Sequence, residues 1–92
     1  MVDRRTRIEQ KLHQALDAIH VDVEDESHLH EGHAGARSGG GHFKAIIVSD
    51  RFAGLSRLEA QRLVYQVLSE EMEGEIHALS ISTLTIREWE SD

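Results

Sequence analysis

The fold of this chain is decided by residues 42–50, which read His42-Phe43-Lys44-Ala45-Ile46-Ile47-Val48-Ser49-Asp50. A short apolar run with Ile46, Ile47 and Val48 at its centre is typical of a buried β-strand. The residues that follow, Arg51-Phe52-Ala53-Gly54, predict a turn because they end in a glycine. We therefore expect a strand over residues 42–50, and the rest of the fold is worked out from it in both directions.

Before this strand, the sequence predicts a helix and another strand. Four apolar residues recur at steps of four, four and three, which is the spacing of one helix face: Ile8, Leu12, Leu16 and Ile19. Thr6 with Glu9 forms one candidate capping box, and Asp3 is an alternative N-cap. Residues 21–24 alternate between apolar and polar, which predicts a strand with one wet face.

After the turn, the sequence predicts a helix, a strand and a final helical turn. Ser56 with Glu59 predicts a capping box, and the helix it opens has an apolar face made of Ala60, Leu63, Val64, Val67 and Leu68. Gly74 suits the position just past the end of this helix. In residues 77–83 we expect Leu79 and Ile81 to face the core with His77 and Thr83. Residues 85–89 predict a capped helical turn with Trp89 as a lid.

The segment between the first two strands is rich in histidine and glycine. Residues 28–41 contain five glycines, which disfavour both helix and strand. Such a long connection is often functional or disordered. We therefore expect a flexible loop over residues 28–41, within a single domain over residues 1–92.

The order of the elements predicts how they meet. The fold class is α/β (α+β): α-β-β-α-β with short extra helical turns, and a three-stranded mixed sheet packed on the helices. The two strands beside the loop pair antiparallel, whereas the long helical connection makes the last two strands parallel. His42 opens one of these parallel strands and His77 opens the other. The loop histidines His28, His30 and His33 therefore join His42 and His77 at one edge of the sheet.

Composition excludes several classes of function. The chain has no cysteine, so it has no disulfide, thiolate nucleophile or sulfur ligand of its own. Its formal net charge is −7 with neutral histidines, which disfavours nonspecific binding to nucleic acid. No apolar run is long enough for a membrane span, and no signal peptide pattern is present. We expect a soluble, cytoplasmic and monomeric protein with no enzymatic site, because no nucleophile–base pair or phosphate-binding loop is found.

The ordered motifs resemble the BolA family. They are Asp25-Glu26-Ser27-His28-Leu29-His30, Gly41-His42-Phe43-Lys44, Val48-Ser49-Asp50-Arg51-Phe52-Ala53-Gly54, His77-Ala78-Leu79-Ser80-Ile81 and the closing Glu88-Trp89. Each motif alone is weak evidence for the family, but the ordered set is specific and covers nearly the whole chain. The resemblance implies a fold related to the type II KH domain, without the glycine-rich nucleotide clamp of that domain.

The resemblance also implies a function and its residues. Members of this family bind a monothiol glutaredoxin and share a bridging [2Fe–2S] cluster with it, in cluster trafficking or iron and redox regulation. The partner supplies a cysteine and glutathione, so no cluster is expected on the isolated chain. The metal ligands carried over are His77 and His30, with His33, His28 and His42 as alternates for the loop ligand. Other members are described as DNA-binding transcriptional regulators of stress response and cell morphology.

Alternatives remain at each candidate residue. His77 alone is as typical of a silent histidine at the end of a core face, and the loop histidines also resemble a nickel- or copper-binding tract. A role in DNA binding would use Arg51, Arg57 and Arg62. The family usually has Arg-His-Arg in the long helix, where this chain has Ala60-Gln61-Arg62, and this departure weakens the nucleic-acid alternative.

Overall fold

Helices pack on a three-stranded mixed sheet, which is the α+β class predicted from the sequence. The computed structural model describes residues 3–26, 41–74 and 76–91. The elements in chain order are α1 (Arg4–Leu16), β1 (His20–Asp25), β2 (Gly41–Val48), η2 (Asp50–Phe52), α3 (Arg57–Val67), η3 (Glu71–Glu73), β3 (Ile76–Leu84) and α4 (Ile86–Glu90). The prediction of a flexible loop over residues 28–41 lies outside the described residues, except that Gly41 is the first residue of β2.

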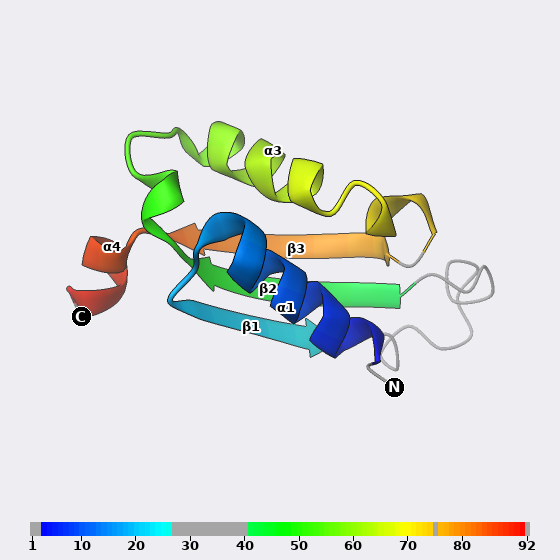
Figure 1. The fold of residues 1–92 in the computed structure, drawn as a ribbon. Helices are drawn as coiled ribbons and strands as arrows, with labels where there is room; N and C mark the ends of the chain where they lie inside the picture. The colour runs from blue at the N-terminus through cyan, green and yellow to red at the C-terminus, as the bar shows by residue number, and fades with distance from the viewer. Residues whose placement is uncertain (1–2, 27–40, 75, 92) are drawn as a thin grey trace.

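The central strand is β2, and the strand order is β1-β2-β3. β1 pairs antiparallel with β2, and β3 pairs parallel with β2, as the lengths of the connections predicted. The end of β1 and the starts of β2 and β3 therefore lie at one end of the sheet. The helices α1 and α3 cover one face of the sheet, and α4 lies at the opposite end from the β2 and β3 starts (Figure 1).

Helix α1 begins and ends at two aspartates. The side chain of Asp3 accepts a hydrogen bond from the backbone N–H of Thr6 at 2.8 Å, so Asp3 is the N-cap and the alternative box with Glu9 is not used. Asp17 is left-handed at φ 48° and ends the helix. The prediction that Ile19 continues the apolar face is wrong, because the helix ends at Leu16 and the Ile19 side chain is 52% exposed.

Helix α3 begins as predicted but ends earlier. Ser56 and Glu59 form the reciprocal capping box, and Ala60, Val64 and Leu68 are buried. The expectation that Gly74 lies just past this helix is wrong. The helix ends at Val67, and Gly74 follows the separate turn η3.

The turn between β2 and α3 depends on two small residues. Ser49 is fully buried, and its hydroxyl donates a hydrogen bond to the Leu16 carbonyl and accepts one from the Arg51 N–H at 3.0 Å. Gly54 has φ 80°, and the Leu55 N–H bonds to the Phe52 carbonyl at 3.1 Å. This pattern is a type II turn, whose third position favours glycine. The chain can therefore reverse from β2 into α3 within a few residues.

The core lies between the sheet and the two long helices. Phe43, Ala45 and Ile47 of β2 are buried, and they alternate with more exposed residues on the other face. Helix α1 contributes Ile8, Leu12 and Leu16. Further buried members come from β1, η2, α3 with its C-cap, and β3, namely Val21, Val23, Phe52, Ala60, Val64, Leu68 and Ile76. Phe43 near the start of β2 and Ile76 at the start of β3 both belong to this core, so the starts of the two strands are packed against it.

Candidate functional site

His77 occupies an irregular position at the start of β3. Gly41 pairs with Ile76, but the next residue of β2, His42, pairs with Ala78, so His77 is an extra residue on β3. One extra residue in a strand is a β-bulge, which locally turns side chains and is frequent near functional sites. The prediction that His77 faces the core is wrong, because its side chain is exposed while Ile76 is 3% exposed.

The sequence contained a signal for this bulge. In a regular strand, residues three apart point to opposite faces. Ile76 and Leu79 are three apart, yet both pack with the core. An extra residue between them accounts for this arrangement. Two apolar residues at an odd spacing in a predicted strand are therefore the sequence signal that could have indicated the bulge.

The bulge brings two histidine rings together. The ring centres of His42 and His77 are 5.2 Å apart, and the ring planes are tilted by 47°. His42 is partly buried, and its Nε2 atom is buried, so water does not hydrate that atom in this arrangement. The prediction that His42 and His77 meet at one end of the sheet is confirmed.

The other three histidines of the predicted edge cluster lie outside the described residues. His28, His30 and His33 belong to the segment 27–40, so their roles stay predictions. Among residues 3–26, 41–74 and 76–91, no group of three or more histidine, cysteine, aspartate or glutamate side chains is arranged to hold a metal ion. The described part of the site therefore consists of two nitrogen donors, one exposed and one partly buried.

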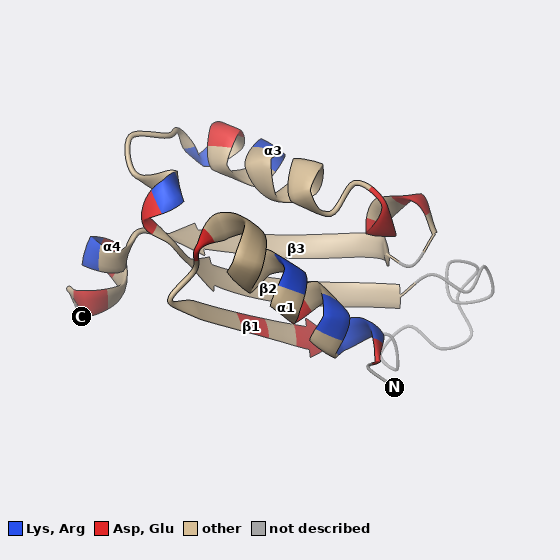
Figure 2. Ribbon diagram, in the orientation of Figure 1, with Lys and Arg blue, Asp and Glu red and all other residues tan. Residues whose placement is uncertain are grey.

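Charged elements surround this end of the sheet. Acidic residues lie at the end of β1 and on η3, and basic residues lie on the first turns of α1 (Figure 2). Lys11 of α1 and Glu71 of η3 form an ion pair with an N–O distance of 2.9 Å. This contact links η3, which precedes β3 in the chain, to the first helix.

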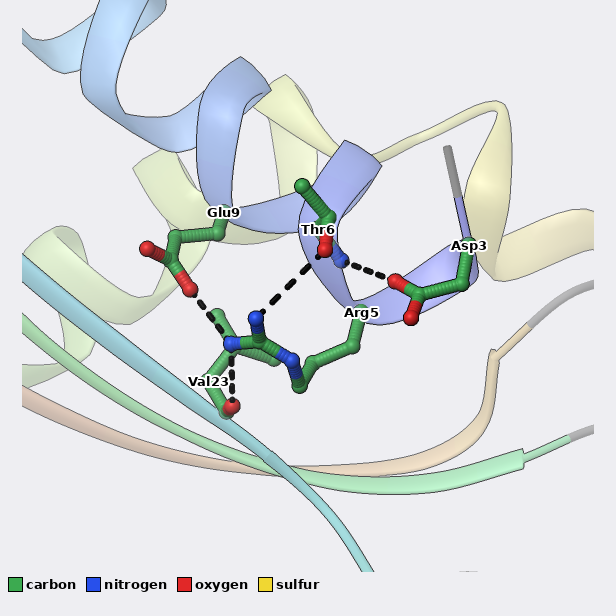
Figure 3. Close-up of polar contacts among 5 residues, drawn as sticks. All are labelled: Asp3, Arg5, Thr6, Glu9 and Val23. Atoms are coloured by element: carbon green, nitrogen blue, oxygen red, sulfur yellow. Dashed lines mark hydrogen bonds and ion pairs between the residues drawn. The ribbon is translucent and has the colours of Figure 1, made fainter. Parts of the chain in front are cut away.

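The start of α1 is fastened to β1 at the same end. Arg5 donates from Nη1 to the Glu9 carboxylate at 2.6 Å and to the Val23 carbonyl at 3.2 Å (Figure 3). The Arg4 guanidinium lies 5.7 Å from the ring centre of Phe43, the residue after His42. Such cation–π contacts contribute about 0.5–1 kcal/mol at exposed sites. Helix and sheet therefore hold each other at the end that carries the histidines.

The arginines predicted for nucleic-acid binding are exposed and line two neighbouring depressions that share Leu55. Arg51 and Arg62 line a shallow depression of about 470 Å³ together with Leu55 and Glu59. Arg57 instead lines a neighbouring depression, which also contains the carboxylate of Glu88. Each depression therefore pairs its arginines with a glutamate.

A stacked pair at the far end of the sheet was not predicted. The ring of His20 at the start of β1 stacks on Trp89 of α4, with centres 4.7 Å apart and planes within 19°. Trp89 remains 44% exposed, so the lid expected from the sequence covers its neighbour only in part. The spacing of His20 and Trp89 in the sequence carries no signal for this contact. It arises because β3 returns the chain to the end where β1 begins.

Comparisons with known proteins agree with this architecture. The sequence profile of the BolA family, described as BolA-like protein, matches residues 12–88. The chain is 45% identical over 86 residues to the DNA-binding transcriptional regulator BolA of Escherichia coli (strain K12), covering 94% of this chain and 79% of that protein. It is 42% identical over 87 residues to SufE-like protein 1, chloroplastic/mitochondrial, of Arabidopsis thaliana, covering 89% of this chain but 24% of that longer protein.

A solved structure shows the same fold. The BolA domain of SufE1 from Arabidopsis thaliana superposes with a TM-score of 0.83 and 40% identity, covering 96% of this chain and 98% of that one. This chain belongs to the BolA family. Among its relatives are proteins named as DNA-binding transcriptional regulators and as BolA-like proteins. Within the described residues, no helix is long and apolar enough to cross a membrane.

Proposed function

We propose that this chain is a non-enzymatic BolA-type adaptor that binds a monothiol glutaredoxin and provides nitrogen ligands to a bridging [2Fe–2S] cluster. The observation that carries the proposal is the exposed bulge position of His77 beside His42. The glutaredoxin and glutathione provide the sulfur ligands, since this chain has no cysteine. The proposal includes a cytoplasmic role in cluster trafficking or in iron and redox regulation.

The available donors fit such a cluster. Imidazole replaces thiolate on one iron in known [2Fe–2S] centres, and the replacement raises the potential of the cluster. A cluster held between two proteins needs ligands at the surface, and His77 is exposed at the start of β3. A second nitrogen comes from His30 in the histidine-rich segment, with His33, His28 and His42 as alternates. When bound, the cluster supplies an iron–sulfur centre that can be sensed or passed on.

The chain itself determines where its histidine ligands lie and in which protonation state they can bind. The bulge turns His77 out of the core, and the ion pair of Lys11 with Glu71 links the preceding turn η3 to α1. Imidazole binds a metal only in its neutral form, so acid weakens ligation. Residues of the chain therefore set the position and the protonation requirement of the shared ligands.

The direct test reconstitutes the complex with a monothiol glutaredoxin, glutathione, iron and sulfide. The visible circular dichroism of the heterodimer's cluster should change strongly in His77→Ala and remain in His13→Ala, a matched histidine variant on α1. Size-exclusion chromatography confirms that both variants stay folded. An unchanged spectrum in His77→Ala would remove His77 from the ligand set.

A DNA-binding role is the second candidate, because the Escherichia coli relative bears that name. It would use Arg51, Arg57 and Arg62. Specific binding to a DNA site survives moderate salt, whereas binding through phosphates alone falls steeply with salt. Binding that disappears near physiological salt, with no preference among sequences, would exclude a specific regulator. The double variant Arg57→Ala/Arg62→Ala should weaken DNA binding if these arginines contact the DNA. Arg87→Ala, which removes an arginine outside the predicted set, is the control.

A further inference from the structure

Two imidazoles from neighbouring strands already lie at the separation that one metal ion requires. The ring centres of His42 and His77 are 5.2 Å apart. Two imidazoles bound to one tetrahedral ion have ring centres about 5 Å apart, because zinc–nitrogen bonds are about 2.0–2.1 Å long and each ring centre lies just behind its nitrogen. Binding of an ion therefore needs rotation of the rings but little movement of the strands.

We propose that the chain by itself binds one divalent ion of the zinc class through one ring nitrogen of His42 and one of His77. Imidazole is a good ligand for zinc, copper and nickel. Among the described residues no third histidine, cysteine, aspartate or glutamate is placed to join this pair. The proposed site therefore has two protein ligands, with water in the remaining coordination positions. Neither a glutaredoxin nor a cluster is needed for this site.

The backbone prepares the pair for a metal. His42 lies on the central strand, and its carbonyl accepts a hydrogen bond from the Glu26 N–H at 2.7 Å. His77 is held by the bulge, which sets its ring beside that of His42. Donors on paired strands lose less freedom on binding than donors on a loop, and sites on strands are more precise. We therefore expect two histidines on paired strands to bind an ion more tightly than two histidines on a flexible loop would.

The ion site has a consequence for the cluster, and only this consequence rests on the proposed function. His77 serves both, so the zinc-class ion and the shared cluster exclude each other. A bound ion would keep the adaptor from accepting a cluster, and transfer of a cluster would release the ion. Added zinc should then slow cluster assembly on the heterodimer, and removal of the zinc with a chelator should restore the original rate.

The ion site is tested without a partner by nuclear magnetic resonance of the histidine rings. Zinc, which is diamagnetic, is titrated into the isolated chain while the imidazole signals of all seven histidines are followed. The signals of His42 and His77 should shift together at one equivalent, and those of His13 and His20 should stay in place. Stationary His42 and His77 signals would overturn the proposal.

Calorimetry with zinc compares the contribution of these two histidines to the affinity with that of the loop histidines. His42→Ala and His77→Ala should each weaken binding by at least about tenfold, because the ion loses one of two protein ligands. The triple variant His28→Ala/His30→Ala/His33→Ala should keep the site. Loss of binding in the triple variant, or less than twofold weakening in either single variant, contradicts the proposal. Amide spectra verify folding, and failure to form a cluster with glutaredoxin would leave this result unaffected.

Discussion

The ring of His77 contacts the ring of His42 because β3 contains one residue more than β2 at this point. Gly41 and Ile76 are paired, His42 and Ala78 are paired, and His77 lies between them. Without the bulge, alternation along the strand would turn His77 toward the buried face. The local irregularity thus turns a residue of a core strand into a donor at the surface.

The first prediction concerns the second ligand of the proposed cluster. In the reconstituted heterodimer, His30→Ala should reduce cluster absorption more than His28→Ala or His33→Ala, because the family resemblance assigns the loop ligand to His30. The measurement is the visible absorption per heterodimer. A larger loss in His42→Ala than in His30→Ala would move the ligand from the loop to the strand.

The sequence predicts the order and pairing of the elements because these follow from strong local signals. Alternation and helical spacing locate the buried positions, and the helical connection requires β2 and β3 to be parallel. The same topology brought His42 and His77 to one end of the sheet. Contacts between residues that are far apart in the sequence are harder to predict from it. The stack of His20 on Trp89, for example, depends on where β3 ends.

The errors have specific physical causes. Ile19 fits a helical stripe, but left-handed Asp17 ends α1 before the stripe is complete. His77 fits a strict two-residue alternation, but the bulge shifts the register. Gly74 resembles a helix terminator, yet α3 already ends at Val67, with Leu68 as its C-cap. In the first two cases a backbone irregularity of one residue interrupts a pattern that continues past it in the sequence. In the third, a separate turn, η3, lies between the helix end and the glycine.

The second prediction concerns buried Ser49. Its hydroxyl bonds to the Leu16 carbonyl and to the Arg51 N–H, so it joins the end of α1 to the start of η2. Ser49→Ala leaves these groups without the hydroxyl and should lower the free energy of unfolding by about 1–3 kcal/mol. Urea denaturation measures the loss. Ser80→Ala, at an exposed position of β3, is the control and should change stability by less than about 0.5 kcal/mol.

The third prediction compares two glycines. Gly54 has φ 80°, and a Cβ there would meet no atom within 4 Å, so any cost of Gly54→Ala is backbone strain. We expect a loss of about 1–2 kcal/mol in the free energy of unfolding, the cost of left-handed backbone for a residue with a Cβ. Gly74→Ala has equal space but no positive φ, and it should cost less. Equal effects of the two substitutions in thermal or urea unfolding would refute the argument.

The fourth prediction concerns acid. The N–H of Ser56 bonds to the Glu59 carboxylate and lowers its pKa below the ordinary value. The unfolded chain therefore binds more protons, so the contribution of Glu59 to stability is complete above its unfolded pKa and is lost as the pH falls through the folded pKa. Glu59→Gln keeps the acceptor oxygen without the charge and should flatten the decline of stability below about pH 5. A decline as steep as in the original chain would contradict this role.

The fifth prediction concerns the stack that holds α4. Trp89 is the sole tryptophan, so its fluorescence reports directly on the contact with His20. His20→Ala should increase the mobility of the indole, seen as lower fluorescence anisotropy, and should cost about 0.5–1.5 kcal/mol, the usual contribution of an aromatic pair beyond its buried area. His20→Phe preserves a stacking partner and should restore most of both signals. If His20→Phe behaves like His20→Ala, the imidazole is not acting as a stacking surface, and α4 is held by the bond of the Ile86 N–H to Asp50 at 3.3 Å instead.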